Sequence, residues 1–439
     1  NILFNGINDC NTATLNATTP RAATQTSVKI GIVPFTSFVN VGAGYASASW
    51  IDQDGISSIA NDNFDDDNND GTAFTGQVDR LALYDDFTNE SWRGCVEARP
   101  HTSTGGSTEF LDTDDTTPDA SVPDSLFVPQ FAPDEPYGWN NSYTSDTPAS
   151  CPMEATWVWT QVKKKCNKKG NNENNYNSAT CTGSTTNSYT LTDQYGTVTH
   201  PTTAPATIDN NTPSIDVNYS STGSGSNRTN TRTETYTYKY SDRELQERLC
   251  KYTGASLSYY GQYGPNTDCP ETPILPLDDT KQNVIDTIDN MQPGGNTNIH
   301  MGTVWGWRVL SPTEPFTEGK DYDPAVSKVM IIMTDGENTL SSSNNMNGGS
   351  YYSAYGFPWN GRISSPYTTN MNNRMADTCT NAKAVGIEIY TIGLNSPNST
   401  TTNLLTNCAT DSSHAYFPTA ANELDDVFED IDNRLSDLR

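Results

Sequence analysis

A carboxylate that follows an apolar run raises the first question about chemistry. In "SKVMIIMTDGENT" (327–339) the residues Val329 to Met333 read as a buried strand, and the polar stretch that begins at Asp335 comes directly after it. In open α/β sheets, ligands bind in the crevice beyond the carboxyl ends of the strands, so we expect Asp335 at such a crevice. The alternative is that Asp335 and Gly336 only form a turn, since both are common turn residues.

A second loop supplies context for Asp335. In "GGNTNIHMG" (294–302) the hydroxyl of Thr297 follows paired glycines, 38 residues before Asp335. In this order the two loops resemble the second and third loops of the metal-ion-dependent adhesion site of von Willebrand factor A domains. The resemblance implies that Thr297 contacts a divalent cation through its hydroxyl and that Asp335 coordinates it directly or through water. Such oxygen ligands suit Mg²⁺, Mn²⁺ or Ca²⁺, with one position left for a carboxylate of the partner.

The family's first loop, Asp-x-Ser-x-Ser at the end of the opening strand, has no match in this sequence. The resemblance covers Val28 to Val39 and Pro273 to Leu438, and "NILFNG" (1–6) matches the helix after the opening strand rather than the strand itself. That strand belongs in the middle of the sheet, where its burial contributes most of a domain's stability. We therefore expect an upstream part of the polypeptide to supply the strand and three further ligands.

Stretches spread over the whole chain narrow the resemblance to the TadG-type proteins of bacterial tight-adherence (Tad/Flp) pilus systems. They include "SWRGCVEARP" (91–100), "LFVPQFAPDEP" (126–136) and "CTNAKAVGIEIYTIGL" (379–394). The resemblance implies an extracellular, cell-surface or periplasmic protein whose upstream segment anchors it to the membrane. It implies pilus subunits or a surface or host ligand as partners. It also supports disulfides Cys379–Cys408 and Cys250–Cys269, although connectivity cannot be derived from sequence.

Composition limits the partners. The chain carries 25 Lys and Arg against 53 Asp and Glu, a net charge of -28, which argues against nucleic acid because phosphate binding requires a basic face. No apolar run approaches the roughly 20 residues that span a bilayer, so membrane contact is expected only through the upstream segment. The nine cysteines contain no Cys-x-x-Cys pair, which favours disulfides in an oxidising compartment over zinc. An odd number leaves one cysteine as a free thiol or with a mate elsewhere.

The elements that must position the loops alternate between strands and helices. Strands are predicted at 28–35 and 386–394, and helical spacing is present in 278–295, 300–310, 373–385 and 423–438. This alternation indicates a doubly wound α/β sheet of the von Willebrand A (Rossmann-like) type, with its opening strand missing. We expect residues 1–51 and 273–439 to form this domain. Residues 52–272 then form a β- and loop-rich insertion that contains disulfides.

The insertion holds strand-like pieces and two charged stretches. "ATWVWTQV" (155–162) and "TETYTYKY" (233–240) alternate in the manner of strands. The basic "KKKCNKKG" (163–170) is interpreted as a solvated face rather than a binding patch. In "DNFDDDNNDGTAFTGQ" (62–77), Asp66, Asn68 and Asp70 fit the first ligands of a Ca²⁺ loop, but Gln77 replaces the bidentate Glu. An acidic surface turn is the alternative.

Aromatic residues follow the Asp335 loop. Tyr351, Tyr352, Tyr355 and Trp359 in "SYYSAYGFPWNGR" (350–362) are predicted to rim the same crevice and to contact a partner. The alternative is a loop that packs its aromatic side chains back on the domain.

Three classes of function remain: a binding protein, a structural part of a filament or its assembly platform, and an enzyme. Neither His300 nor His414 has an evident Ser or Cys nucleophile motif, and no Gly-x-Ser-x-Gly elbow follows a predicted strand. We therefore expect no enzyme. The ligand residues and rim aromatics favour a cation-assisted binder, and a scaffold without cation-dependent adhesion is the alternative.

Overall fold

The strand that precedes Asp335 lies at one edge of a small parallel sheet. The structure, a computed structural model, describes residues 28–64, 76–101, 111–146, 148, 154–192, 198–199, 202–208, 211–257, 263–340, 346–395 and 397–437. Strand β10 (Lys328–Thr334) pairs in parallel with β11 (Ile387–Gly393), and β11 with β12 (Ala415–Tyr416). A separate antiparallel pair joins β1 (Ile30–Ile32) to β9 (Leu275–Asp278). Within the described part of the chain, β1 and β10 each have a strand neighbour on one side only.

Helix α6 (Ile299–Leu310) packs against both β1 and β10 and so holds the two sheets together. Two glycines allow the close approach. A Cβ on Gly31 would lie 2.5 Å from Val309 Cγ1, and one on Gly306 would lie 2.8 Å from Met330 Sδ. The helix is almost wholly buried and carries its Trp and Val side chains into two different apolar clusters. Its position therefore fixes where Thr297, at its N-terminal end, lies relative to β10.

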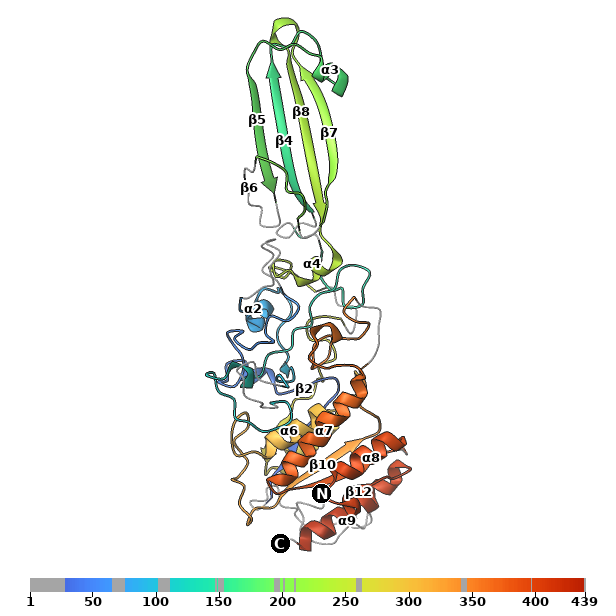
Figure 1. The fold of residues 1–439 in the computed structure, drawn as a ribbon. Coiled ribbons are helices and arrows are strands. Elements are labelled where there is room, and N and C mark those ends of the chain that lie inside the picture. Colours follow the sequence, from blue (N-terminus) through green and yellow to red (C-terminus); the bar gives the residue numbers. More distant parts are fainter. Residues whose placement is uncertain are drawn as a thin grey trace.

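Further helices complete this α/β base (Figure 1). They are α5 (Lys281–Asp289), α7 (Tyr367–Ala384), α8 (Ser399–Cys408) and α9 (Leu424–Asp437). Helices α7 and α8 pack on β11 and are joined by the disulfide Cys379–Cys408, which confirms that predicted pairing. Ile431 of α9 packs against Tyr390 and Ile392 of β11. The base is thus a mixed α/β structure with helices over β11.

Strand β10 differs from the expectation of a strand buried on both faces. Met330 and Ile332 are buried, whereas Ile331 and Met333, which alternate with them, are 36% and 44% exposed. In the described residues, one face of β10 is therefore uncovered, next to the edge that has no strand neighbour.

A loop-rich middle region lies on the base. It contains α2 (Arg80–Asp85), α4 (Asp242–Glu247) and the short ladder of β2 (Val39–Asn40) with β3 (Cys95–Val96). Aromatic rings form its core, with Phe131 packed edge-on against Tyr84 and Tyr252. Short 3-10 turns occur here and elsewhere, at Ala43–Tyr45, Pro123–Ser125, Gly225–Asn227, Pro358–Asn360, Ser412–His414 and Ala421–Glu423.

Disulfides in the middle region correct one prediction. Cys269 is bonded to Cys95, 174 residues away in sequence, so the predicted pairing Cys250–Cys269 is wrong. Cys250 is itself in a disulfide. The predicted pairing joined two cysteines close together in sequence, whereas the fold brings β3 against the segment that contains Cys269. Disulfides of this kind are typical of oxidising compartments.

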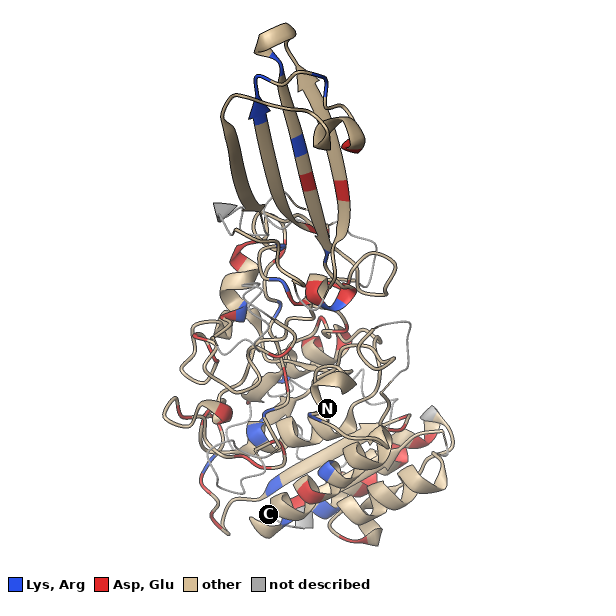
Figure 2. Cartoon of the chain, turned by 45° about the horizontal axis from the view of Figure 1, so that its top comes forward, with Lys and Arg blue, Asp and Glu red and all other residues tan. Residues whose placement is uncertain are grey.

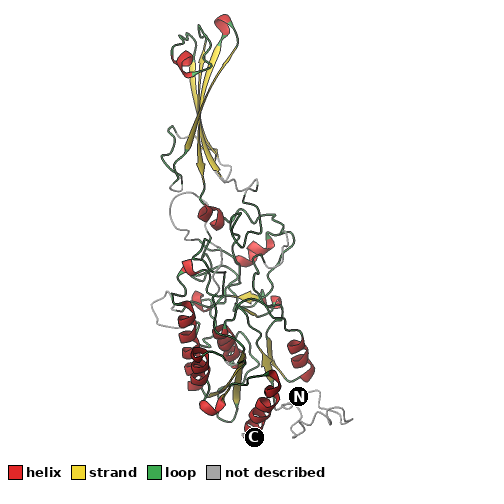
Figure 3. Cartoon of the chain, turned by 90° about the vertical axis from the view of Figure 1, so that its right-hand side faces the viewer, coloured by secondary structure: helices red, strands yellow, loops and turns green. Residues whose placement is uncertain are grey.

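Farthest from the base, a five-stranded antiparallel sheet projects as a stalk (Figures 1 and 3). Its strand order is β6-β5-β4-β8-β7. Strand β4 contains the predicted stretch 155–162, β8 contains all but the last residue of the predicted stretch 233–240, and these two strands pair along their whole length. The bounds are β4 (Glu154–Lys164), β5 (Thr185–Thr192), β6 (Val198–Thr199), β7 (Ser214–Thr222) and β8 (Thr229–Lys239), with helix α3 (Glu173–Asn177) at the far end.

Candidate functional site

The two loops that resemble an adhesion site lie side by side. The backbone N–H of Thr339 donates to the carbonyl oxygen of Thr297 at 2.9 Å. The side chain of Asn338 accepts from the N–H of Ile299, at the start of α6, at 2.7 Å. A Cβ placed on Gly336 would lie 3.5 Å from Thr297 Oγ1. The Thr297 hydroxyl therefore lies next to the residue that follows Asp335.

Local hydrogen bonds and a turn explain how Thr297 is positioned. Asn298 caps α6, because its side chain accepts from the N–H of Met301 and its own N–H donates to the carbonyl oxygen of Thr36. Gly295 has a φ of 62°, a left-handed conformation that favours glycine. The turn and the cap together direct the chain from the loop into the helix.

A third loop, which sequence reasoning missed, borders the same place. Ser37, just after β1, accepts a hydrogen bond from the N–H of Asn296 at 3.2 Å and donates to Asp268 at 3.3 Å. Burial raises the pKa of Asp268, and the hydrogen bond from Ser37 opposes that shift. The polar residues Thr36 and Ser37 after a strand were a signal that could have been noticed. Asp268 gave no such signal in the sequence, because it lies 231 residues from Ser37.

Two further carboxylates at the loops are exposed. Asp335 and Glu337 are both exposed, and the Glu337 carboxylate accepts from the amide of Asn398 at 2.7 Å. Asp335 has no hydrogen bond or ion pair among the described residues. In the same described ranges, no group of three His, Cys, Asp or Glu side chains converges as a metal site would. Thr297 and Asp335 thus offer oxygen donors that fit a hard cation in type, but a six-coordinate ion needs ligands beyond them.

Beneath the loops, His300 is fully buried in a hydrogen-bonded chain. Its Nε2 lies 2.8 Å from the carbonyl oxygen of Asp112, which can only accept, so Nε2 carries the proton and Nδ1 accepts from the Tyr355 hydroxyl at 2.6 Å. Burial lowers the pKa of His300 to about 4, helped by the positive charges of Arg374 and Arg308 and opposed by Asp112. The imidazole is therefore neutral and positions Tyr355 next to the cap of α6.

The neutral His300 predicts a pH dependence of stability. Its folded-state pKa lies below the unfolded value of about 6.5, so the unfolded chain takes up the proton first and stability falls as pH decreases from about 6.5 to 4. A shift of this size corresponds to about 3 kcal/mol. Urea unfolding at pH 7 and pH 4.5 measures this dependence. Between these two pH values, His300→Gln should lose less free energy of unfolding than the unchanged chain. Equal losses would contradict the assignment, as would NMR showing uptake of a proton by this ring above pH 5.5.

The predicted aromatic rim needs correction. Tyr352 and Tyr355 are 2% and 1% exposed, so neither can contact a partner. The Tyr352 hydroxyl donates to the buried carboxylate of Glu97, and Tyr355 belongs to the His300 chain. Trp359 and Tyr351, at 66% and 37% exposure, lie at the surface. The loop therefore packs half of its predicted rim into the core, because buried polar partners are present there for the tyrosine hydroxyls.

The predicted calcium loop with Asp66, Asn68 and Asp70 lies outside the described residues. Among the described helices, none is long and apolar enough to cross a membrane.

Comparison with known proteins gives a partial structural likeness. No family model matches the sequence, and no curated protein matches it. One similar solved structure is the proximal thread matrix protein 1 of the mussel byssus with a zinc-occupied MIDAS motif, at 20% identity and a TM-score of 0.24 over 35% of this chain and 31% of that one. Another is the pilus adhesin SpaC of Lactobacillus rhamnosus GG, at 14% identity and a TM-score of 0.28 over 38% and 23%. This chain thus spans less than a third of the length of either neighbour.

Proposed function

We propose that this chain belongs to a TadG-type von Willebrand A adhesion protein, displayed outside the inner membrane of a bacterium. Its Thr297 and Asp335 would hold Mg²⁺, Mn²⁺ or Ca²⁺ together with ligands from a strand outside the described residues. The cation would then bind a carboxylate of a pilus subunit or of a surface ligand. The observation that carries this proposal is the contact between the two loops, in which Thr339 bonds to Thr297 and Gly336 lies against the Thr297 hydroxyl.

The separated strands support the same proposal. Strands β1 and β10 each have a strand neighbour on one side only within the described chain, and α6 packs on both. A strand placed between them would end beside the Thr297 and Asp335 loops, because in a sheet with parallel central strands the carboxyl ends meet at one edge. Ligands at the end of that strand would complete the coordination of the cation.

Asp335→Ala tests the cation site. We expect Asp335→Ala to abolish Mn²⁺-dependent attachment of the protein, isolated from its native cells, to its target surface, because the substitution removes the charged ligand. Thermal unfolding should stay unchanged, because Asp335 is exposed. Attachment is measured with and without EDTA. Asp289→Ala is the matched control, because it removes an equally exposed carboxylate from the end of α5. Attachment that is indifferent to both EDTA and Asp335→Ala would favour the scaffold function instead.

A further inference from the structure

The far end of the stalk is a distinct surface, which we call the tip: residues 163–183 and 222–228. It comprises the end of β4, the loop with α3, and the turn before β8 (Figure 1). The disulfide Cys166–Cys181 closes its main loop. Each central strand has 11 residues, which corresponds to a length of about 35 Å between the tip and the middle region.

The tip concentrates positive charge in an acidic protein (Figure 2). It holds six of the 25 Lys and Arg residues but only one, Glu173, of the 53 Asp and Glu residues. The six cations are Lys163, Lys164, Lys165, Lys168, Lys169 and Arg228. The sequence interpretation of "KKKCNKKG" as a solvated face rested on the overall charge of -28. The position of the tract at the tip changes that interpretation, because all but one of the acidic residues lie outside the tip.

Distance separates this charge from the acidic body. At physiological salt, charges farther apart than about 8 Å are largely screened from one another. The body lies about 35 Å from the tip along the strands, so its negative charge does not cancel the local field of the lysines. Lys164, Lys165 and Lys169 are also exposed. The tip therefore presents an uncompensated cationic surface to any partner that approaches the end of the stalk.

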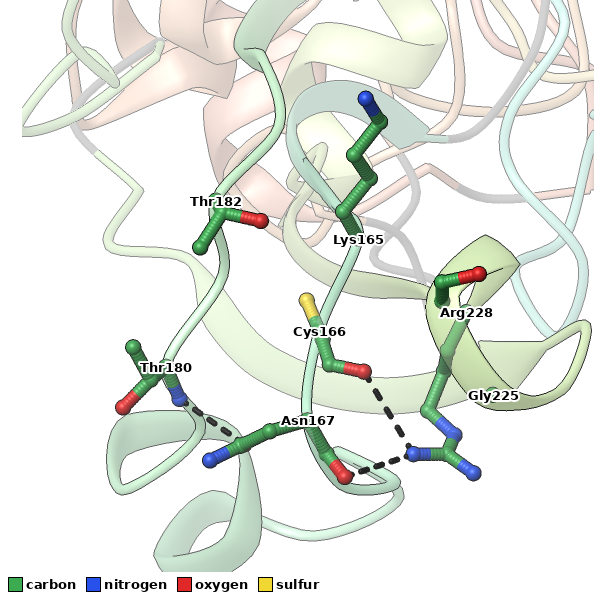
Figure 4. A pocket seen from close by; sticks show the side chains of 8 residues that line it. Lys165, Cys166, Asn167, Thr180, Thr182, Gly225 and Arg228 are labelled. Atoms are coloured by element: carbon green, nitrogen blue, oxygen red, sulfur yellow. Dashed lines mark hydrogen bonds between the residues drawn. The ribbon is translucent and has the colours of Figure 1, made fainter.

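An open polar depression of about 510 Å³ lies in this surface (Figure 4). It is lined by Lys165, Asn167, Thr180, Thr182, Ser226 and Arg228. The Arg228 guanidinium is held in place, because Nη1 donates to the carbonyl oxygens of Asn167 at 2.9 Å and Cys166 at 3.4 Å. Its buried Nε has no hydrogen-bond partner in the described structure. A guanidinium held in place beside hydroxyl and amide groups suits a ligand that carries both anionic and hydroxyl groups.

We propose that the tip binds an anionic polysaccharide, through ion pairs with the lysines and hydrogen bonds from the depression. A lipid surface fits less well, because no large hydrophobic residue of the described tip is exposed. This contact is separate from the loops of Thr297 and Asp335, which adjoin α6 and β10 of the base. It gives the protein a second point of attachment, at the place that reaches farthest from the base.

The test compares two triple variants of the full chain. In the tip variant Lys164, Lys165 and Lys169 become Gln; in the control variant Lys29, Lys239 and Lys320, exposed lysines elsewhere, become Gln. Affinity electrophoresis measures binding to dextran sulfate, polygalacturonate and neutral dextran. We expect binding to both anionic polymers but not to dextran, and it should weaken as salt rises. The tip variant should bind about ten-fold more weakly, since each exposed ion pair contributes a fraction of a kcal/mol, and the control variant should match the unchanged chain.

Several outcomes would overturn this proposal. They are equal losses in the two variants, binding to neutral dextran, or binding only to vesicles of phosphatidylglycerol. A salt-sensitive self-association that the tip variant abolishes would instead identify a second copy of the chain as the partner. Binding should resist EDTA and survive Asp335→Ala, so failure at the tip and failure of the proposed cation site give different results.

Discussion

Replacing Glu97 with alanine is expected to lower the free energy of unfolding by about 3 to 5 kcal/mol, the usual effect of breaking a buried ion pair. Glu97 is fully buried, and its carboxylate accepts from the guanidinium groups of Arg80 and Arg362 and from the hydroxyl of Tyr352. Arg80 is 1% exposed. Without Glu97 its positive charge stays buried and unpaired, which is the larger part of the expected loss.

Urea unfolding followed by circular dichroism measures this loss. Glu271→Ala serves as the control, because Glu271 is exposed and its removal should change the free energy of unfolding by less than about 0.5 kcal/mol. Glu97→Gln should fall between the two, since it keeps hydrogen-bonding atoms but removes the charge. A loss below 1 kcal/mol for Glu97→Ala would mean that other groups compensate the charges of the guanidinium groups. The ion pairs of Glu97 would then not be a main source of stability in the middle region.

Under the proposed function, a strand added between β1 and β10 is expected to stabilise the chain and to create tight cation binding. The probe is a synthetic peptide of alternating apolar residues that ends in Asp-x-Ser-x-Ser. It can pair with the edges of β1 and β10 that have no strand neighbour among the described residues, and it can cover Ile331 and Met333, which are exposed there. At 100 times its dissociation constant, such a peptide raises the free energy of unfolding by about 2.7 kcal/mol.

Calorimetry with Mn²⁺ separates the effect of the added strand on stability from its effect on metal binding. The chain with peptide should bind Mn²⁺ at least ten-fold more tightly than the chain alone, because the peptide adds oxygen ligands to Thr297 and Asp335. Asp335→Ala should keep the rise in melting temperature but lose the tight Mn²⁺ binding. A scrambled peptide of the same composition should do neither. If the correct peptide leaves the melting temperature unchanged, the proposed place of the strand between β1 and β10 is wrong.

The sequence predicted those features whose signals are local. Helix α6 and strand β11 follow from the spacing of their own apolar residues, and the structure places them at 299–310 and 387–393. Asp335 was singled out because it follows a predicted strand, and Thr297 because its loop resembles an adhesion-site loop. Their adjacency in space follows from the packing of α6 on β10.

Features that depend on distant contacts were not predictable. Nothing near Cys269 indicates Cys95 as its partner, and nothing near Tyr352 indicates the carboxylate of Glu97, 255 residues away. An aromatic residue in a loop is compatible with exposure or burial until the polar group that receives its hydroxyl is known. Whether the basic tract 163–170 is a binding surface likewise depended on its place in the fold. The sequence shows the charge of the tract but not its distance from the acidic body.

The bond between Cys95 and Cys269 encloses most of the middle region and the whole stalk in one covalent ring. Residues 96–268, which include the stalk, form a single loop whose two ends the disulfide joins. A protease that cleaves once within the stalk therefore opens the ring without releasing a fragment, and the two pieces separate on a gel only after reduction. A protein exposed to secreted proteases can in this way lose one peptide bond and still remain connected from its base to its far end.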